Sequence, residues 1–218
     1  MKTTVLFDLD GTLLDTLSDL TTGTNLALGD LGFPPRTREE VRSFVGNGIG
    51  LLIHRAFPVG TDPATEAETL ARFKYHYGLH CMDETVPYPG IPELLRDLRA
   101  AGLRTAIISN KADFAVQQLA ERYFSGLLDA AQGEAPPLRR KPAPDMSLAV
   151  LERMGVPRTQ AIYVGDSPVD AETAKTAGFS GILVDWGFRS RQELCSTGLP
   201  VASHPRELYD LIMNTARD

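Results

Sequence analysis

The chain has 218 residues, a hydrophobic content of 43% and a formal net charge of −6 at pH 7. This length and apolar content suit one large domain, or a domain that carries an insertion. The acidic balance argues against nonspecific binding to nucleic acid or to anionic membranes, and it favours a small-molecule partner.

Cysteine content and hydropathy predict the compartment. Cys81 and Cys195 are too few for a disulfide framework, so we expect two reduced thiols. No apolar run approaches the roughly 18 residues of a membrane span, and the run near the start is too short for a signal peptide. We therefore expect a cytoplasmic monomer or homodimer that binds neither membrane nor nucleic acid.

The first predicted element is a short buried strand at Val5–Phe7, which leads directly into two aspartates. Asp8 and Asp10 share a face if the strand continues, and both reach one point beyond its end if the chain breaks there. Gly11 permits a backbone conformation that other residues avoid, so the amides from Thr12 onward can turn toward an anion. This pattern predicts a phosphate site; the alternative is an ordinary turn that ends a strand.

A run of helices is predicted next. Apolar spacing indicates a helix over 15–31, a capping box at 37–40 opens a second, and residues 51–57 form a third. Pro63 opens a longer helix that includes Tyr77. Prolines and a glycine within 83–90 then mark a boundary.

Strands and helices alternate beyond this boundary. The predicted strands are 103–109, 127–131, 161–164 and 181–185, and the predicted helices are 91–101, 112–123, 145–154, 168–177 and 205–215. This alternation indicates a Rossmann-like α/β fold, a parallel sheet with its ligand site at the carboxyl ends of the strands. We predict a discontinuous α/β core domain of residues 1–14 and 85–218, with an inserted helical cap domain of residues 15–84. Residues 132–137 should form an irregular loop.

Two of the later predicted strands are followed by groups that can bind or neutralise phosphate. Ser109 and Asn110 can donate to phosphate oxygens, although such a pair is more often a helix N-cap. Lys141, in the run Lys-Pro-Ala-Pro-Asp, offers a compact positive charge on a backbone fixed by prolines. The adjacent Arg139 and Arg140 are expected to be solvated surface residues.

The strand at 161–164 leads into the run Gly-Asp-Ser-Pro-Val-Asp, which contains Asp166 and Asp170. Carboxylates without a nearby histidine or cysteine favour a hard cation such as Mg²⁺ over zinc. The alternative is that Asp166 only caps the following helix. The run therefore predicts either a magnesium ligand or a helix start.

Taken together, the four segments resemble the four motifs of the haloacid dehalogenase (HAD) superfamily of phosphatases, in the same order along essentially the whole chain. The resemblance implies that Asp8 attacks phosphorus to form an aspartyl-phosphate, while Asp10 acts first as general acid and then as general base. It also implies that Lys141 neutralises charge between phosphate and nucleophile.

The same resemblance implies a ligand set. Mg²⁺ would be held by the Asp8 carboxylate, the Asp10 carbonyl and Asp166, with Asp170 in support. The residues expected to bind the phosphate are Gly11, Thr12, Ser109, Asn110 and Lys141.

The predicted cap resembles that of one HAD subfamily, the phosphoglycolate phosphatases, at Phe44–Gly48 and the following Leu51–Ala56. This implies a small phosphate ester, phosphoglycolate, as substrate. Asn47 offers a carboxamide between two glycines at a predicted helix start, which favours a small carboxylate; equally, the glycines merely separate two helices. The loop at 132–141 departs from the shorter, more acidic loop of that subfamily, which leaves the substrate open.

Three alternatives remain on this scaffold: an inorganic pyrophosphatase, a sugar-phosphate mutase, and a binding protein that has lost catalysis. The ending Asp10-Gly11-Thr12-Leu13 resembles hydrolases more than mutases. Retention of every acid together with Lys141 argues against a silent protein. Asp10 also argues against carbon–halogen cleavage, because the dehalogenase branch lacks this second aspartate.

Overall fold

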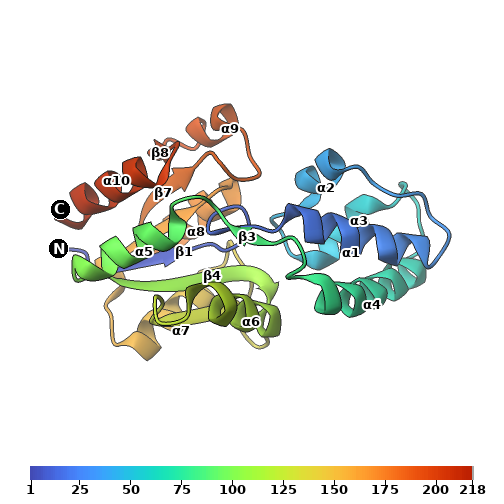
Figure 1. The fold of residues 1–218 in the computed structure, drawn as a ribbon, viewed down its shortest axis with the longest axis horizontal. Helices are drawn as coiled ribbons and strands as arrows, with labels where there is room; N and C mark the ends of the chain where they lie inside the picture. The colour runs from blue at the N-terminus through green and yellow to red at the C-terminus, as the bar shows by residue number, and fades with distance from the viewer. Residues whose placement is uncertain (218) are drawn as a thin grey trace. The chain divides into compact units, whose positions relative to one another are not determined.

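The computed structural model describes residues 1–217, which divide into two compact units (Figure 1). The α/β unit contains Met1–Leu14 together with the chain from Pro87 onward, and the helical unit contains Asp15–Val86. The chain passes between the units at two short strands, β2 (Leu14–Asp15) and β3 (Val86–Pro87), which pair with each other. The second boundary predicted from the sequence lies two residues before the one that divides these units.

A parallel sheet forms the centre of the α/β unit. Within residues 1–217 its strands are β1 Thr4–Phe7, β4 Arg104–Ala112, β5 Ala130–Glu134, β6 Ala161–Gly165, β7 Ser180–Val184 and β8 Val201–Ala202. Their order is β5-β4-β1-β6-β7-β8, so the chain builds outward from β1 first on one side and then on the other. Ligands of such sheets bind beyond the carboxyl ends of the strands at this reversal. The predicted Rossmann-like α/β fold is confirmed.

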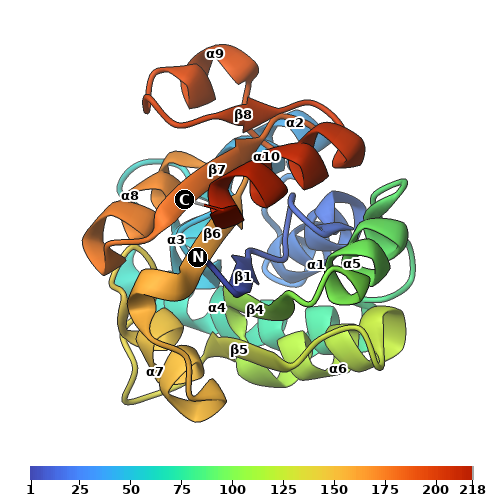
Figure 2. The ribbon, with the colours of Figure 1, turned by 90° about the vertical axis from the view of Figure 1, so that its left-hand side faces the viewer.

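Helices cover both faces of this sheet, as Figure 2 shows. They are α5 Ile91–Ala100, α6 Asp113–Phe124, α7 Asp145–Met154, α8 Pro168–Ala177 and α10 Pro205–Arg217, and α7 and α8 have the bounds predicted from the sequence. Because strand side chains alternate, Val5 and Phe7 of β1 pack in one cluster with α5, α6 and α10. Leu6 packs in a second cluster with α7 and α8. Burial on both faces explains the continuous apolar runs that predicted the strands.

One predicted strand is present but shifted, and the loop predicted after it is shorter than expected. The strand predicted at 127–131 is β5, at 130–134, so the loop predicted at 132–137 begins inside a strand. Leu127 and Leu128 are apolar because they pack against the core from the turn that follows α6. Apolar content alone therefore did not separate this turn from the strand.

The structure also extends one strand and adds short elements. β4 continues to Ala112, three residues past its predicted end, because it pairs with β5 again after an irregularity in register. A 3₁₀ turn at Arg158–Gln160, the helix α9 at Arg191–Cys195 and the two-residue strand β8 were not predicted. Each is too short to produce a hydrophobic period.

The helical unit consists of α1 Leu17–Gly29, α2 Arg38–Phe44, α3 Ile49–Ala56 and α4 Pro63–His80. Thr37 and Glu40 exchange hydrogen bonds at the start of α2, which confirms the predicted capping box. The buried carboxylate of Asp19 on α1 accepts hydrogen bonds from the N–H groups of Glu84 and Thr85, which ties the end of this unit to its start. No helix among the described residues is long and apolar enough to cross a membrane.

Candidate active site

The first two aspartates follow β1 at the carboxyl edge of the sheet. Asp8 directly follows the strand, and its N–H donates to the carbonyl of Val164 on β6 at 2.8 Å. The N–H of Leu14 donates to the Leu9 carbonyl at 3.0 Å, which closes a tight turn around Asp10. The side chain of Asp8 is buried and that of Asp10 partly exposed. Both acids therefore remain near the strand end, as expected from the motif.

Gly11 and Thr12 lie within this turn. Gly11 has a φ of 81°, and a Cβ atom at this position would overlap the Asp166 carboxylate. A glycine is required for the turn to approach the end of β6 so closely. The Thr12 carbonyl accepts a hydrogen bond from Trp186 Nε1 at 3.1 Å, while its buried hydroxyl has no hydrogen-bond partner among the described residues. Phosphate binding by this turn stays a prediction.

Lys141 reaches the same point from the loop before α7. Its Nζ lies 2.8 Å from Asp8 Oδ1 and 2.8 Å from Asp170 Oδ1, and its side chain is 2% exposed. The Asn110 carboxamide fixes the lysine backbone, since its Oδ1 accepts from the Lys141 N–H at 2.7 Å and its Nδ2 donates to the Lys141 carbonyl at 3.1 Å. The sequence did not predict that Asn110 positions Lys141.

Three buried carboxylates surround this lysine. Asp8, Asp166 and Asp170 each offer an oxygen, and these oxygens all lie within 4.8 Å of one another. Asp166 accepts a hydrogen bond from the N–H of Phe188 at 2.7 Å. Ser167, not Asp166, is the N-cap residue of α8, so the alternative that Asp166 serves as this cap is wrong. The three acids form a candidate metal site made of oxygen ligands.

Burial and neighbouring negative charges make the ionised forms of Asp8 and Asp166 unfavourable. Burial raises the pKa of the Asp8 carboxyl group well above its ordinary value, although Lys141 opposes the shift. Burial, reinforced by the charge of Asp170, raises the pKa of Asp166 to about 7. For Lys141, burial opposes the charged form, but Asp170 and Asp8 outweigh it and hold the pKa well above its ordinary value. One ammonium thus faces three acids, and a further cation would relieve the repulsion.

A second buried lysine, which the sequence did not single out, pairs with the other aspartate. Lys111 Nζ lies 3.0 Å from Asp10 Oδ1, and the lysine side chain is only 3% exposed. Lys111 stands on β4 two residues after Ser109, whose Oγ accepts from the Lys111 N–H at 3.2 Å. Because β1 and β4 are adjacent parallel strands, residues just beyond Phe7 and Ile107 meet at one edge. The sequence signal that could have identified Lys111 is its position directly after Ser109 and Asn110.

The structure thus places nine of the ten predicted site residues in the α/β unit, near the carboxyl ends of β1, β4 and β6, with Asp170 in α8 and Lys141 in the loop before α7. Asn47 is the exception, because it belongs to the helical unit, one residue before the Gly48 N-cap of α3. Its carboxamide oxygen accepts from Arg55 Nη2 at 3.1 Å, and Arg55 Nη1 also donates to the Phe44 carbonyl at 2.8 Å. Asn47 helps hold the loop before α3, and contact with substrate stays a prediction.

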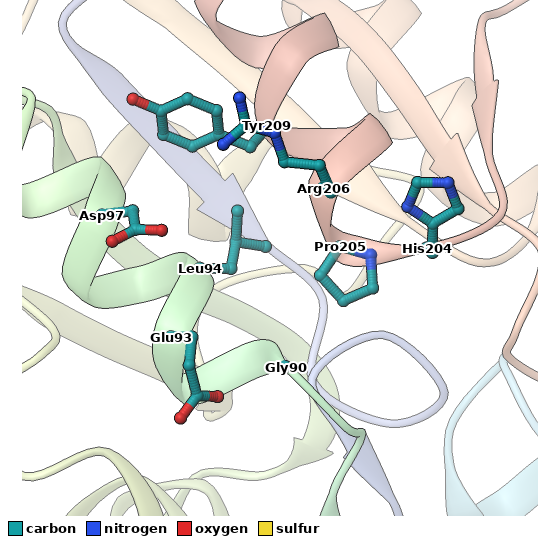
Figure 3. Close-up of a pocket in the computed structure, with 8 residues that line it drawn as sticks. All are labelled: Gly90, Glu93, Leu94, Asp97, His204, Pro205, Arg206 and Tyr209. Atoms are coloured by element: carbon teal, nitrogen blue, oxygen red, sulfur yellow. The ribbon is translucent and has the colours of Figure 1, made fainter.

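A separate hollow of about 320 Å³ lies between α5 and α10 (Figure 3). Glu93 and Asp97 line it from α5. Arg206, in the first turn of α10, and His204, directly before α10, line the other side. None of the aspartates and lysines described above contributes to its lining. The hollow is therefore distinct from the candidate active site.

Comparison with known proteins gives a consistent result over nearly the whole chain. Residues 5–184 match the family described as haloacid dehalogenase-like hydrolase. A phosphoglycolate phosphatase of Rhodospirillum rubrum is 36% identical over 208 residues, which cover 91% of this chain and 85% of that protein. A phosphoglycolate phosphatase of Cereibacter sphaeroides is 36% identical over 214 residues, which cover 95% of this chain and 96% of that protein.

Solved structures resemble this fold throughout both units. A candidate phosphoglycolate phosphatase from Lactobacillus delbrueckii subsp. bulgaricus superposes with a TM-score of 0.92 at 35% identity, over 97% of this chain and 99% of that one. CbbY from Rhodobacter sphaeroides, solved in complex with phosphate, gives a TM-score of 0.79 at 26% identity, over 95% of this chain and 96% of that one.

Proposed function

This chain belongs to the haloacid dehalogenase-like hydrolases, and we propose that it hydrolyses a small phosphate monoester through an aspartyl-phosphate formed on Asp8. The names of its relatives identify it as a phosphoric monoester hydrolase. The covalent step and the roles of individual residues are the parts that we propose.

One arrangement supports this function most directly: Lys141 bridges Asp8 and Asp170, with Asp166 beside them, in a buried site. A phosphate monoester is nearly dianionic at pH 7, so a carboxylate can attack it only where cations offset the repulsion. Burial strengthens the attraction between Lys141 and the phosphoryl oxygens, because the local dielectric constant is low. The site is thus suited to bring a carboxylate and a phosphate together.

The donor set fits Mg²⁺. Oxygen atoms from Asp8 and Asp166, with the Asp10 carbonyl, would hold the ion, and Asp170 would support the site through Lys141 and Ser167. When bound, Mg²⁺ supplies positive charge that neutralises the phosphoryl oxygens. The clustering of Asp8 with Asp166 and the absence of histidine and cysteine from the group support a hard cation over zinc.

The residues then divide the reaction between them. Asp8 attacks phosphorus and becomes phosphorylated, while Asp10 gives a proton to the oxygen of the leaving alcohol. In the second half-reaction Asp10 takes a proton from water, which attacks the aspartyl-phosphate and releases inorganic phosphate. Lys141 stays against the phosphoryl oxygens throughout, and Ser109 with the backbone amides of the Gly11 turn hold the remaining oxygens.

We further propose that residues 15–84 act as a cap and that the substrate is phosphoglycolate. The relatives from Rhodospirillum rubrum and Cereibacter sphaeroides carry the name phosphoglycolate phosphatase. The core groups assigned above engage the phosphoryl group and the oxygen of the leaving alcohol, so a cap that closes over the rest of the leaving group can also contribute to specificity. Asn47, in the loop before α3, is the cap residue proposed to contact the substrate carboxylate.

A substrate panel tests this function. The purified chain should hydrolyse 2-phosphoglycolate with a higher kcat/KM than an aryl phosphate, a hexose phosphate or pyrophosphate, and only in the presence of Mg²⁺. Product analysis separates release of phosphate from transfer within a sugar phosphate. Full activity in excess chelator would overturn the metal assignment. Preference for pyrophosphate or a hexose phosphate would overturn the substrate, and no hydrolysis of any monoester would overturn the function.

A further inference from the structure

Two buried lysines divide the active-site aspartates between them. Lys141 pairs with Asp8 at 2.8 Å, and Lys111 pairs with Asp10 at 3.0 Å. Both ammonium groups belong to side chains no more than 3% exposed. The mechanism above assigns Lys141 to the phosphoryl group and gives Lys111 no role in binding or catalysis.

A buried lysine needs an explanation, because removing an ammonium group from water costs more than a single ion pair usually returns. Apolar side chains of similar volume in such positions often give equal or greater stability. The strand does not require this cation either, since Ile107 and Ile108 of β4 are fully buried apolar residues. Lys111 is therefore a candidate for a role in chemistry or binding rather than in folding.

The two aspartates mark the two ends of the substrate. Asp8 attacks phosphorus, so Lys141 lies on the phosphoryl side. Asp10 serves the oxygen of the leaving group, so a cation within 3.0 Å of its carboxylate lies on the leaving-group side. In a glycolate leaving group the carboxylate carbon is two bonds from that oxygen, which brings its charge within reach of the same ammonium.

We propose that Lys111 binds the acidic group of the leaving portion, so that the α/β unit itself selects a short carboxylated phosphomonoester. This inference rests on the proposed phosphatase function and adds a specificity residue to it. Each anionic end of the substrate then meets its own buried lysine: phosphate meets Lys141, and carboxylate meets Lys111. On binding, the Lys111 ammonium shares its donors between Asp10 and the substrate carboxylate, which also holds Asp10 toward the leaving oxygen.

A pair of substrates separates this role from simple support of Asp10. 2-Phosphoglycolate and 2-hydroxyethyl phosphate have similar leaving groups, but only the first carries a carboxylate. In the Lys111→Met variant, the ratio of their kcat/KM values should fall about 10- to 100-fold, as for loss of one charged hydrogen bond. The fall should come mainly from a higher KM for 2-phosphoglycolate. A variant that slows both substrates equally would overturn the inference and leave Lys111 as a positioning residue for Asp10.

Two further variants serve as controls. Lys175→Met removes an exposed lysine of α8, paired with Glu172 at 3.7 Å, and should leave the ratio unchanged. Asn47→Ala tests the rival position in the helical unit. If Asn47→Ala lowers the ratio and Lys111→Met does not, selection resides in the cap and the inference is wrong.

A structural measurement covers the case in which Lys111 variants do not fold. A crystal structure of the Asp8→Asn variant with 2-phosphoglycolate should place Lys111 Nζ within hydrogen-bond distance of the substrate carboxylate. A carboxylate held elsewhere, or directed into solvent, would contradict the assignment. If the wild-type enzyme hydrolyses no phosphomonoester at all, the proposed function itself has failed; an active enzyme with an unaltered substrate ratio in Lys111→Met defeats only this inference.

Discussion

Exposed acids of the helical unit and buried acids of the α/β unit have pKa values that are shifted in opposite directions. In the helical unit, a hydrogen bond with His76, reinforced by Arg72, holds the pKa of Asp30 below its ordinary value. Hydrogen bonds from Thr65 lower the pKa of Asp62 at the start of α4 in the same direction. These carboxylates lie at the surface, where water and donors stabilise the ionised form. Their charges support local structure.

In the α/β unit, burial raises the pKa of Asp8 and of Asp166 instead. The local environment destabilises the ionised form of each acid, and Lys141 bridges two members of the cluster. An arrangement that costs stability in this way is typical of a site that binds a cation and a charged substrate. A raised pKa therefore distinguishes the buried Asp8 and Asp166, which are expected to act in chemistry, from exposed acids such as Asp30 and Asp62, which support local structure.

Removing the nucleophile should have the largest effect. Asp8→Asn keeps the shape of the side chain but removes its nucleophilic carboxylate, so kcat should fall by roughly 10⁴ to 10⁶. Steady-state hydrolysis of an aryl phosphate measures this, with circular dichroism and the melting temperature as controls for folding. A purified variant that keeps even a tenth of wild-type activity would show that Asp8 is not the nucleophile.

Removing the bridging cation should have the next largest effect. Lys141→Ala should lower kcat by about 10² to 10³, because one preorganised charge stabiliser is lost. Arg139→Ala is the matched control, since this neighbouring guanidinium is 74% exposed and pairs with Asp145 at the surface. Its effect on kcat should stay within about twofold. Equal losses in the two variants would remove the distinction between buried and exposed cations.

The raised pKa of Asp166 predicts how metal activation depends on pH. Because burial raises the pKa of this group to about 7, a metal ion that binds below that pH must displace a proton. The Mg²⁺ concentration for half-saturation should therefore rise by at least about tenfold for each pH unit well below 7, since the pKa of the other ligand Asp8 is also raised. Calorimetric Mg²⁺ titrations at several pH values measure binding without the contribution of catalysis. A constant affinity between pH 5.5 and pH 7.5 would contradict the assignment.

The smallest effect should follow from breaking a surface ion pair of the helical unit. Arg72 contacts Glu68 at 2.7 Å and Asp30 at 3.3 Å, but its side chain is 39% exposed. Because solvent screens such pairs, Arg72→Ala should lower the melting temperature by no more than about 3 °C. Its kcat for an aryl phosphate should match that of wild type. A large loss of activity would show that the exposed charges of this unit also serve the reaction.

The sequence predicted most of the α/β fold because its strands are apolar on both faces and its helices end at clear caps. It predicted the candidate site because polar groups at adjacent strand ends meet at one edge. Pairings across that edge were not predictable, because the partner of a side chain depends on strand order. The position of Lys111 directly after Ser109 and Asn110 is a local signal for this residue, but neither its contact with Asp10 nor the hydrogen bonds between Asn110 and Lys141 can be derived from local spacing.

The central claim is that the buried Asp8 becomes phosphorylated during turnover, and trapping this intermediate tests it most directly. The wild-type enzyme is mixed with 2-phosphoglycolate and Mg²⁺, quenched in acid within milliseconds, and treated with borohydride, which reduces an acyl phosphate to an alcohol. Peptide mass spectrometry then locates the reduced residue. We expect homoserine at position 8, absent when substrate is omitted. Unmodified Asp8 at every quench time during rapid phosphate release, or reduction at another acid, would contradict the account.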